Sequence, residues 1–501
     1  MTSGFAAGAR AELPRVAPES VGVPAGALER LMCELERITD PHSIMIARDG
    51  KVCCEAWWQP YSPAVPHMLA SHSKGYSATA IGILVTQGKL SVDDLVCELL
   101  SEYMPDVIPE NLKKMRVRHL LTMTSGMTTL PDITLPDWER DFFRCEMTHE
   151  PGSTFFYSGN FTAMLCVIVR KVAGCDVKEF LTRELFNKIG IDPETIKWMT
   201  HADGLEYGGG GMITITENNL RLGLLYMNGG VWQGERILSE EWVEQALGAQ
   251  FLFRGAHSKD LGYGYQTWLG QPHNAPRFDG AGGQYTIMYR DRGLTISITE
   301  SGSFNVNDVV LDAVERFCDE VSDGSLPEDP EADASLMRRI ATLAAPRTLA
   351  VKPVSARAGE LCGRTWEFPS NRLTFYPVVW GKLTALMRFG LDKLRFERGE
   401  GDGEMLLRLE FAGEEQLLHV SFDGLARLSR LNVPHDLPEW VYAYGAWSSE
   451  SMLELRVHVV EAASTVAFTL ELSGDAGELA IITQQPNMLT HSMDTETIRS
   501  L

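Results

Sequence analysis

The sequence predicts an α+β domain followed by an all-β domain. Within residues 1–321, hairpin patterns stand near both ends, with helical patterns between them. An acidic stretch that contains proline follows, and beyond it the chain consists mainly of short runs in which apolar and polar residues alternate. Strands that enclose helices are typical of a sheet with a helical insert, whereas repeated alternating runs are typical of a meander closed into a barrel.

The predicted sheet of the first domain depends on two hairpins. Residues 43–58 alternate around Asp49-Gly50, a dipeptide that favours the tight turn between two antiparallel strands. Residues 284–290 and 294–300, separated by a short turn, have the same character. We expect both pairs to belong to one antiparallel sheet.

Helices are predicted between these hairpins. Residues 74–87 are apolar or small on every face, which predicts a helix buried on all sides. Helical periodicity also marks residues 217–227, 239–247 and 305–321. The helices therefore form an insert within the predicted sheet.

The domain boundary is predicted within residues 322–335, which are acidic, contain proline and have few large apolar residues. A helix is expected at 337–345, so the prediction is two domains, 1–321 and 346–501, joined by a linker and short helix over 322–345. Six alternating runs predict strands of the second domain: 373–379, 383–389, 406–411, 417–422, 453–460 and 466–472.

The composition argues against two classes of partner. The chain has 45 Lys and Arg against 67 Asp and Glu, and the net charge of −22 repels nucleic acids and anionic membrane surfaces. No run approaches the roughly 18 apolar residues of a membrane span, and the first residues lack the pattern of a secretory signal. Nine cysteines without paired spacing fit reduced thiols. We expect a cytoplasmic protein without nucleic-acid or membrane partners.

The tetrapeptide Ser71-His72-Ser73-Lys74 carries the predicted chemistry. At the start of a helix, positions i and i+3 share a face, so the Ser71 hydroxyl and the Lys74 amine come within hydrogen-bond reach. Burial and the positive end of the helix dipole disfavour the ammonium form and leave the amine able to act as a base. We therefore predict Ser71 as nucleophile and Lys74 as base, with His72 pointing away in a structural role.

The surrounding sequence resembles the serine β-lactamase and penicillin-binding superfamily, in particular its class C-like esterase and amidase branch. The similarity runs from about residue 14 to 321 and includes LASHSKGYSATAIGILVTQGKLSVDD, RHLLTMTSGM, EPGSTFFYSGN, GGGGM and YMNGGVWQGERILSEEWVE. It implies a β-lactamase/transpeptidase-like α/β sandwich for this region. Residues 346–501 resemble the lipocalin-like barrels that are appended to many members.

In this superfamily a Tyr-x-Asn motif supplies a tyrosine that relays protons beside the serine and lysine. The matching residue is Tyr157, but Gly159 stands where asparagine is usual. Asn160 follows one position later, so the sequence leaves open which of the two takes that place. Without the motif amide, we expect substrate recognition to differ from that of penicillins.

A third superfamily motif has Lys, His or Trp, then any residue, then glycine, and it falls at Phe278-Asp279-Gly280. An apolar ring and a carboxylate there disfavour ligands that carry a carboxylate, such as β-lactams and peptide C-termini. The oxyanion hole needs only N–H groups, which the resemblance assigns to Ser71 and Ala281. The residues expected to contact substrate are Gly159, Asn160, Phe278, Asp279, Gly280 and Gly282.

Together these features predict a serine hydrolase that cleaves esters or small amides through an acyl-enzyme on Ser71. Three alternatives stay open: an acyltransferase that passes the acyl group to a small-molecule alcohol or amine, a β-lactamase or D-aminopeptidase, and a non-catalytic module that binds acyl ligands. The chemistry needs no metal or cofactor, and the expected partner is a small ester or amide. The C-terminal β domain allows a homodimer.

Overall fold

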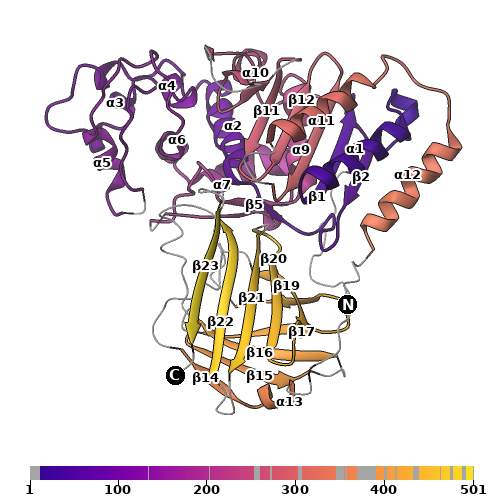
Figure 1. Ribbon diagram of the computed structural model, residues 1–501. Helices are drawn as coiled ribbons and strands as arrows, with labels where there is room; N and C mark the ends of the chain where they lie inside the picture. The colour runs from indigo at the N-terminus through magenta and orange to yellow at the C-terminus, as the bar shows by residue number, and fades with distance from the viewer. Residues whose placement is uncertain are drawn as a thin grey trace. The chain divides into compact units, whose positions relative to one another are not determined.

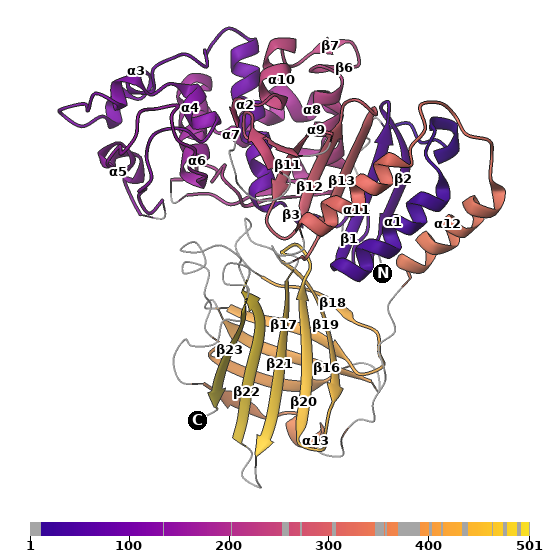
Figure 2. The ribbon, with the colours of Figure 1, turned by 45° about the horizontal axis from the view of Figure 1, so that its top comes forward.

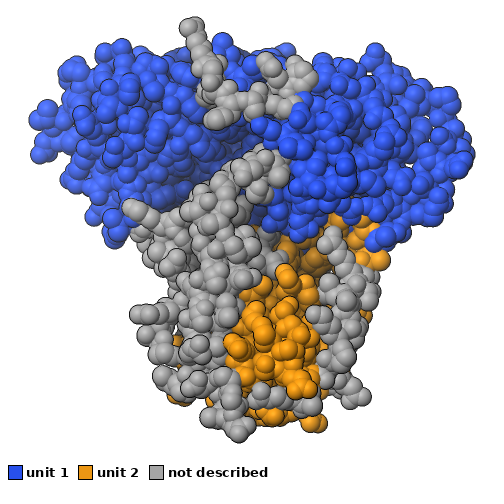
Figure 3. All heavy atoms as spheres, viewed as in Figure 1, with its two compact units in different colours: residues 1–57, 63–342 blue, residues 58–62, 343–501 orange. Residues whose placement is uncertain are grey.

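The computed structural model in Figure 1 forms two compact units. Unit 1 comprises residues 1–57 and 63–342, and unit 2 comprises residues 58–62 and 343–501, coloured separately in Figure 3. The structure describes residues 12–499 apart from 134, 202, 253–259, 271–272, 303–306, 346–354, 356–357, 369–390, 400–402, 412–413, 433–438, 463, 474–477 and 488–491.

Unit 1 is built on an antiparallel sheet with the strand order β2-β1-β13-β12-β11-β10-β9-β8. Its strands are β1 (Pro41–Arg48), β2 (Lys51–Trp57), β8 (Phe251–Leu252), β9 (Asp260–Tyr263), β10 (Trp268–Gly270), β11 (Ala275–Gly280), β12 (Gln284–Tyr289) and β13 (Leu294–Glu300). Both predicted hairpins are confirmed, as β1 pairs with β2 and β12 with β13. Asp49 and Gly50 take φ values of 49° and 77°, the left-handed conformation that the tight turn requires.

Helices cover both faces of this sheet. On one face, Met45 and Ala47 of β1 cluster with Leu220 and Leu224 of α9 (Thr216–Met227). Because side chains alternate along a strand, the other residues of β1 point to the opposite face. There α1 (Ala25–Ile38) and α11 (Asn307–Asp319) lie side by side in Figures 1 and 2.

The helical insert is arranged around α2 (Ser73–Thr86), whose residues 73–84 are all buried, as the sequence predicts. Its principal partner is α6 (Gly159–Ala173). The other α-helices of unit 1 are α3 (Val96–Leu99), α4 (Val117–Leu121), α5 (Trp138–Arg144), α7 (Val177–Leu181), α8 (Asn187–Ile189), α10 (Glu240–Leu247) and α12 (Pro330–Leu343). The residues that the structure describes include no helix with the length and apolarity needed to cross a membrane.

The remaining elements of unit 1 are short. They are η1 (Pro18–Val21), η2 (Ala70–His72), η3 (Ser101–Tyr103), η4 (Leu112–Lys114), η5 (Thr182–Phe186), η6 (Pro193–Thr195), and the strands β3 (His67–Met68), β4 (Lys197–Trp198), β5 (Met212–Thr214), β6 (Val231–Trp232) and β7 (Glu235–Arg236). Strands β3, β5 and β4 form a small antiparallel sheet. Strand β3 ends three residues before the predicted nucleophile Ser71.

Unit 2 is a curled sheet that forms a half-barrel in Figures 1 and 2. After α13 (Ala358–Leu361) come β14 (Thr365–Glu367), β15 (Lys393–Arg398), β16 (Glu404–Phe411), β17 (Glu414–Ser421), β18 (Arg427–Arg430), β19 (Trp440–Trp447), β20 (Met452–Val459), β21 (Ser464–Ser473), β22 (Glu478–Asn487) and β23 (Ser492–Arg499). The overall α+β class is as predicted. The predicted strands 373–379 and 383–389 lie outside the described residues.

Unit 2 departs from a simple meander at one place. Strand β17 pairs with β19 in parallel through Ser421 and Tyr444, while β18 pairs with β19 on an antiparallel ladder. The segment predicted as a linker and short helix contains α12, which has 14 residues. The limits predicted for the two domains remain a prediction.

Candidate active site

Ser71 lies in a tight turn between a strand and a helix. Strand β3 ends at Met68, η2 follows, and α2 begins at Ser73. Ala70, directly before Ser71, has φ of 50°, a conformation that costs a non-glycine residue roughly 1 kcal/mol or more. The turn is held by Ser73, whose hydroxyl donates to the Ala70 carbonyl at 2.7 Å and accepts the Met212 N–H at 3.2 Å. Ser71 therefore stands on a fixed, strained turn.

The structure brings Ser71 and Lys74 into contact. Lys74 Nζ lies 2.9 Å from Ser71 Oγ and donates to the Gly209 carbonyl at 2.5 Å. Both side chains are buried, with 8% and 3% of their surface exposed. Burial lowers the pKa of Lys74 to about 7. A neutral amine can donate one N–H to Gly209 and accept the Ser71 proton on its lone pair.

Tyr157 completes this group. Its ring lies beneath the amine, with Lys74 Nζ 4.9 Å from the ring centroid. Burial raises the pKa of Tyr157 above its ordinary value, hydrogen bonds with the side chains of Ser71 and Trp268 oppose the rise, and nearby Asp279 adds to it. The tyrosine is therefore a neutral phenol beside the serine, and the three residues predicted for catalysis lie together.

The next residues show how Gly159 and Asn160 lie relative to Tyr157. Ser158 caps α6, its hydroxyl accepting the Asn160 N–H at 3.2 Å, and Gly159 is the first residue of that helix. The Asn160 amide donates to the Pro131 carbonyl at 2.9 Å. Asn160 is thus engaged with a neighbouring loop, and Gly159 stands two positions after Tyr157 without a side chain.

Phe278 does not line the site, which corrects the prediction made from the sequence. Its side chain is 1% exposed and belongs to the core of unit 1. The ring lies edge-on to His72 and Tyr226, with centroid distances of 5.6 and 5.4 Å. It packs so closely on α2 that a Cβ at Gly75 would lie 2.6 Å from it. The alternation of β11 therefore directs this ring toward the helix layer.

Asp279 points to the other face of β11 and is paired. Arg277 Nε donates to Asp279 at 2.8 Å, while Arg277 Nη2 donates to Asp260 at 2.7 Å. The Arg277 side chain is only 6% exposed. One guanidinium thus pairs with two carboxylates, and Asp279 lies near Tyr157. Burial raises the pKa of Asp279 above its ordinary value, and the Arg277 guanidinium opposes the rise. The motif position alone did not reveal Arg277, although residues i and i+2 of a strand share a face.

The end of β11 abuts the turn that carries Ser71. A Cβ at Gly280 would collide with the Leu69 carbonyl and lie 3.1 Å from the His72 nitrogen. Only glycine therefore fits there. Ala281 is the next residue, and Gly282 has φ of 80° in the turn that follows. The predicted oxyanion residue Ala281 thus follows directly on the contact with the nucleophile turn.

His72 is directed away from the predicted nucleophile. Its Nε2 lies 2.8 Å from the Thr286 hydroxyl of β12, and burial lowers the pKa of His72 to about 3. A neutral imidazole in this position ties the turn to the sheet. This contact agrees with the predicted structural role.

Comparison with known proteins places this site in a family. The β-lactamase family profile matches residues 42–317, more than half of the chain. The chain belongs to the β-lactamase family. The matched range contains every residue of the site described above.

Relatives of this β-lactamase family member match it in part. The 6-aminohexanoate-dimer hydrolase of Paenarthrobacter ureafaciens is 24% identical over 233 residues, which are 42% of this chain and 58% of that protein. Protein flp of Staphylococcus aureus (strain MW2) is 25% identical over 174 residues, 31% of this chain and 34% of that protein. The chain therefore matches less than two thirds of the length of either relative.

Two solved structures share the fold at low sequence identity. A Bacillus anthracis protein described as a 6-aminohexanoate-dimer hydrolase has a TM-score of 0.51 and 17% identity, covering 64% of this chain and 89% of its own. A β-lactamase-like protein from Bacteroides dorei DSM 17855 has a TM-score of 0.50 and 18% identity, covering 58% and 98%. These likenesses concern the fold alone.

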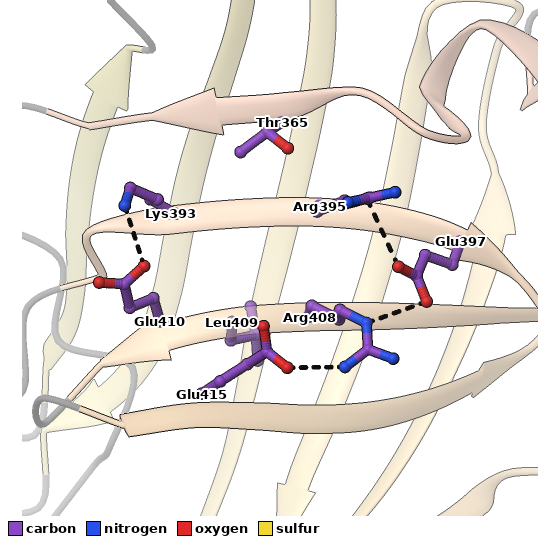
Figure 4. A pocket seen from close by; sticks show the side chains of 8 residues that line it. All are labelled: Thr365, Lys393, Arg395, Glu397, Arg408, Leu409, Glu410 and Glu415. Carbon is purple, nitrogen blue, oxygen red and sulfur yellow. Dashed lines mark hydrogen bonds and ion pairs between the residues drawn. The ribbon is translucent and has the colours of Figure 1, made fainter.

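Unit 2 has a shallow pocket of about 340 Å³ on strands β14 to β17, shown in Figure 4. Its charges pair across the strands: Lys393 with Glu410 at 3.2 Å, and Arg408 with Glu397 at 2.9 Å and with Glu415 at 2.6 Å. Such cross-strand pairs are a common feature of a solvated sheet.

The described part of the chain contains no group of three His, Cys, Asp or Glu suited to a metal ion.

Proposed function

We propose that this β-lactamase family member is a serine hydrolase that cleaves esters or small amides through an acyl-enzyme on Ser71. The observation that carries the proposal is the contact of Ser71 Oγ with a buried Lys74 amine at 2.9 Å, combined with a lysine pKa of about 7. A lysine that is half deprotonated at neutral pH is matched to the task of a general base.

The first half of the reaction forms the acyl-enzyme. Ser71 Oγ attacks the carbonyl carbon of the substrate while its proton passes to Lys74 Nζ. The new C–O bond produces a tetrahedral oxyanion, which the N–H groups of Ser71 and Ala281 would stabilise. When the intermediate collapses, the bond to the leaving group breaks. The Lys74 ammonium passes its proton through the Tyr157 phenol to the departing alcohol or amine, which leaves Lys74 neutral again.

The second half releases the acyl group. Water takes the place of the leaving group, gives a proton to the neutral Lys74 amine, and attacks the acyl carbonyl. The Ser71–acyl bond then breaks, the proton returns to Ser71 Oγ, and a carboxylic acid leaves. An alcohol or amine in place of water would give the alternative outcome, transfer of the acyl group.

The cluster of Asp260, Arg277 and Asp279, with two carboxylates for one guanidinium, supports a preference for substrates without a carboxylate near the scissile bond. A partly buried negative charge repels such a group more strongly than it would in water. This disfavours β-lactams and peptides with a free C-terminus. The name of one relative, 6-aminohexanoate-dimer hydrolase, supports amides within the proposed substrate class.

A substrate panel tests the proposal. Nitrophenyl esters, linear amides, D-amino acid amides and the chromogenic cephalosporin nitrocefin are offered to the wild-type protein and to Ser71→Ala. We expect steady turnover of an ester or amide that exceeds nitrocefin turnover and disappears in Ser71→Ala. A stoichiometric burst without turnover would instead favour the binding module, and unchanged turnover in Ser71→Ala would refute the role of Ser71.

A further inference from the structure

The position two residues after Tyr157 is filled by a side chain from a distant loop. Gly159 has no side chain, but a Cβ built there would lie 2.5 Å from the Tyr207 hydroxyl and 3.3 Å from Tyr207 Cζ. The backbone of the glycine loop is equally close, since a Cβ at Gly209 would lie 2.7 Å from Gly159 Cα. Any side chain at position 159 would therefore displace the Tyr207 hydroxyl.

Tyr207 is held firmly in this position. Its N–H donates to the Met199 carbonyl at 2.9 Å, and its ring lies edge-on to His201 with a centroid distance of 5.8 Å. The ring also runs along the loop beside the predicted nucleophile, because a Cβ at Gly210 would lie 3.3 Å from Tyr207 Cε1 and 3.7 Å from the Ala70 carbonyl. The hydroxyl is thus fixed against Gly159, and the ring lies against Gly210, a loop residue close to the Ala70 carbonyl of the nucleophile turn.

The hydroxyl of Tyr207 is available to a ligand. No hydrogen bond joins this hydroxyl to a described residue, and its oxygen is not among the fully enclosed polar atoms of the described residues. Burial raises the pKa of Tyr207 to about 12, so the phenol keeps its proton near neutral pH. The hydroxyl lies against Gly159, two residues after Tyr157, and Tyr207 also raises the pKa of Tyr157. A rigid, neutral O–H next to the proton-relaying phenol is therefore an uncommitted hydrogen-bond donor in the site.

We propose that Tyr207 is a specificity-determining residue, whose hydroxyl donates a hydrogen bond to an acceptor oxygen in the acyl portion of the substrate. It takes the place that the side chain at position 159 leaves empty. A phenol offers one donor on a ring of fixed position, so it favours acyl groups with a carbonyl or hydroxyl oxygen beyond the scissile carbonyl. This assignment depends on the proposed hydrolase function.

A pair of esters of matched length tests the assignment. Nitrophenyl N-acetylglycinate carries an acyl-side carbonyl, whereas nitrophenyl pentanoate has the same chain length without it. Tyr207→Phe keeps the ring and removes the donor, so we expect the ratio of kcat/KM for the two esters to fall roughly tenfold, mainly through KM. Tyr265→Phe removes a hydroxyl that donates to Gln245 at 3.0 Å and should leave the ratio unchanged.

A double substitution tests whether the two positions share one space. Gly159→Asn should lose activity because its side chain collides with the Tyr207 hydroxyl. Adding Tyr207→Ala should restore N-acetylglycinate hydrolysis above the level of Gly159→Asn alone. An unchanged ester ratio in Tyr207→Phe, or a double variant no better than Gly159→Asn, would overturn this assignment alone. Wild-type protein that hydrolyses neither ester would overturn the proposed function and this assignment with it.

Discussion

Lowering the pH should switch off the enzyme by protonating Lys74. Burial holds the pKa of this lysine at about 7. At about pH 8, roughly nine tenths of the molecules carry the neutral amine, and at about pH 6 roughly one tenth do. Because only the neutral form can accept the Ser71 proton, we expect kcat/KM to fall about tenfold for each further pH unit below about 6.

The assay is kcat/KM for a nitrophenyl ester between about pH 5 and 9, corrected for spontaneous hydrolysis. Lys74→Arg serves as the matched perturbation, because a guanidinium stays protonated at every pH of the assay. It should lose activity by about a thousandfold or more, as is usual when one member of a catalytic group is removed. Lys89→Arg makes the same exchange at an exposed position after α2 and should retain the wild-type profile.

Two results would refute this reasoning. A fall in kcat/KM with its midpoint near pH 10, the ordinary lysine pKa, would show that Lys74 is not desolvated in the working enzyme. A profile that keeps its midpoint near pH 7 in an active Lys74→Arg variant would assign the titration to another group.

Three further predictions concern stability and selectivity. The pKa of Lys74 in the folded state lies below its unfolded value of 10.5, so folding near pH 7 expels a proton and costs roughly 4 kcal/mol. Lys74→Met should therefore raise Tm near pH 7 in thermal melts, and the gain should shrink toward pH 10. No gain at pH 7 would contradict this. Asp279→Asn removes one of the two carboxylates that pair with Arg277 and should improve the kcat/KM of an ester that carries a carboxylate about fivefold relative to a neutral ester. Gly75→Ala places a Cβ 2.6 Å from Phe278 and should destabilise the protein by about 1–3 kcal/mol in denaturant melts; wild-type stability would argue against this packing.

Local chemistry accounts for what could be predicted from the sequence. Asp49 and Gly50 favour the left-handed turn that the first hairpin needs, so both strands and their pairing follow. Ser71 and Lys74 stand one helical turn apart, which fixes their contact without any knowledge of the rest of the fold. The apolar run after Lys74 likewise predicts the burial that lowers its pKa.

Contacts between distant segments could not be predicted in this way. Phe278 was expected in the site, but only the register of β11 within the sheet decides that its ring faces the helices and not the site. The Gly209 carbonyl reaches Lys74, and Tyr207 reaches Gly159, through a loop whose sequence carries no local signal for either contact. The glycines of that loop are explained by close packing, since a Cβ at Gly208 would collide with Cys166.

Peptide mapping by mass spectrometry tests the central claim most directly. The protein is treated near neutral pH with a fluorophosphonate and, separately, with a slowly hydrolysed activated ester, then digested. The account predicts one covalent adduct on the peptide that contains Ser71, absent in Ser71→Ala and strongly slowed in Lys74→Met. An active protein without that adduct, or an adduct on another residue that forms equally fast in both variants, would contradict it.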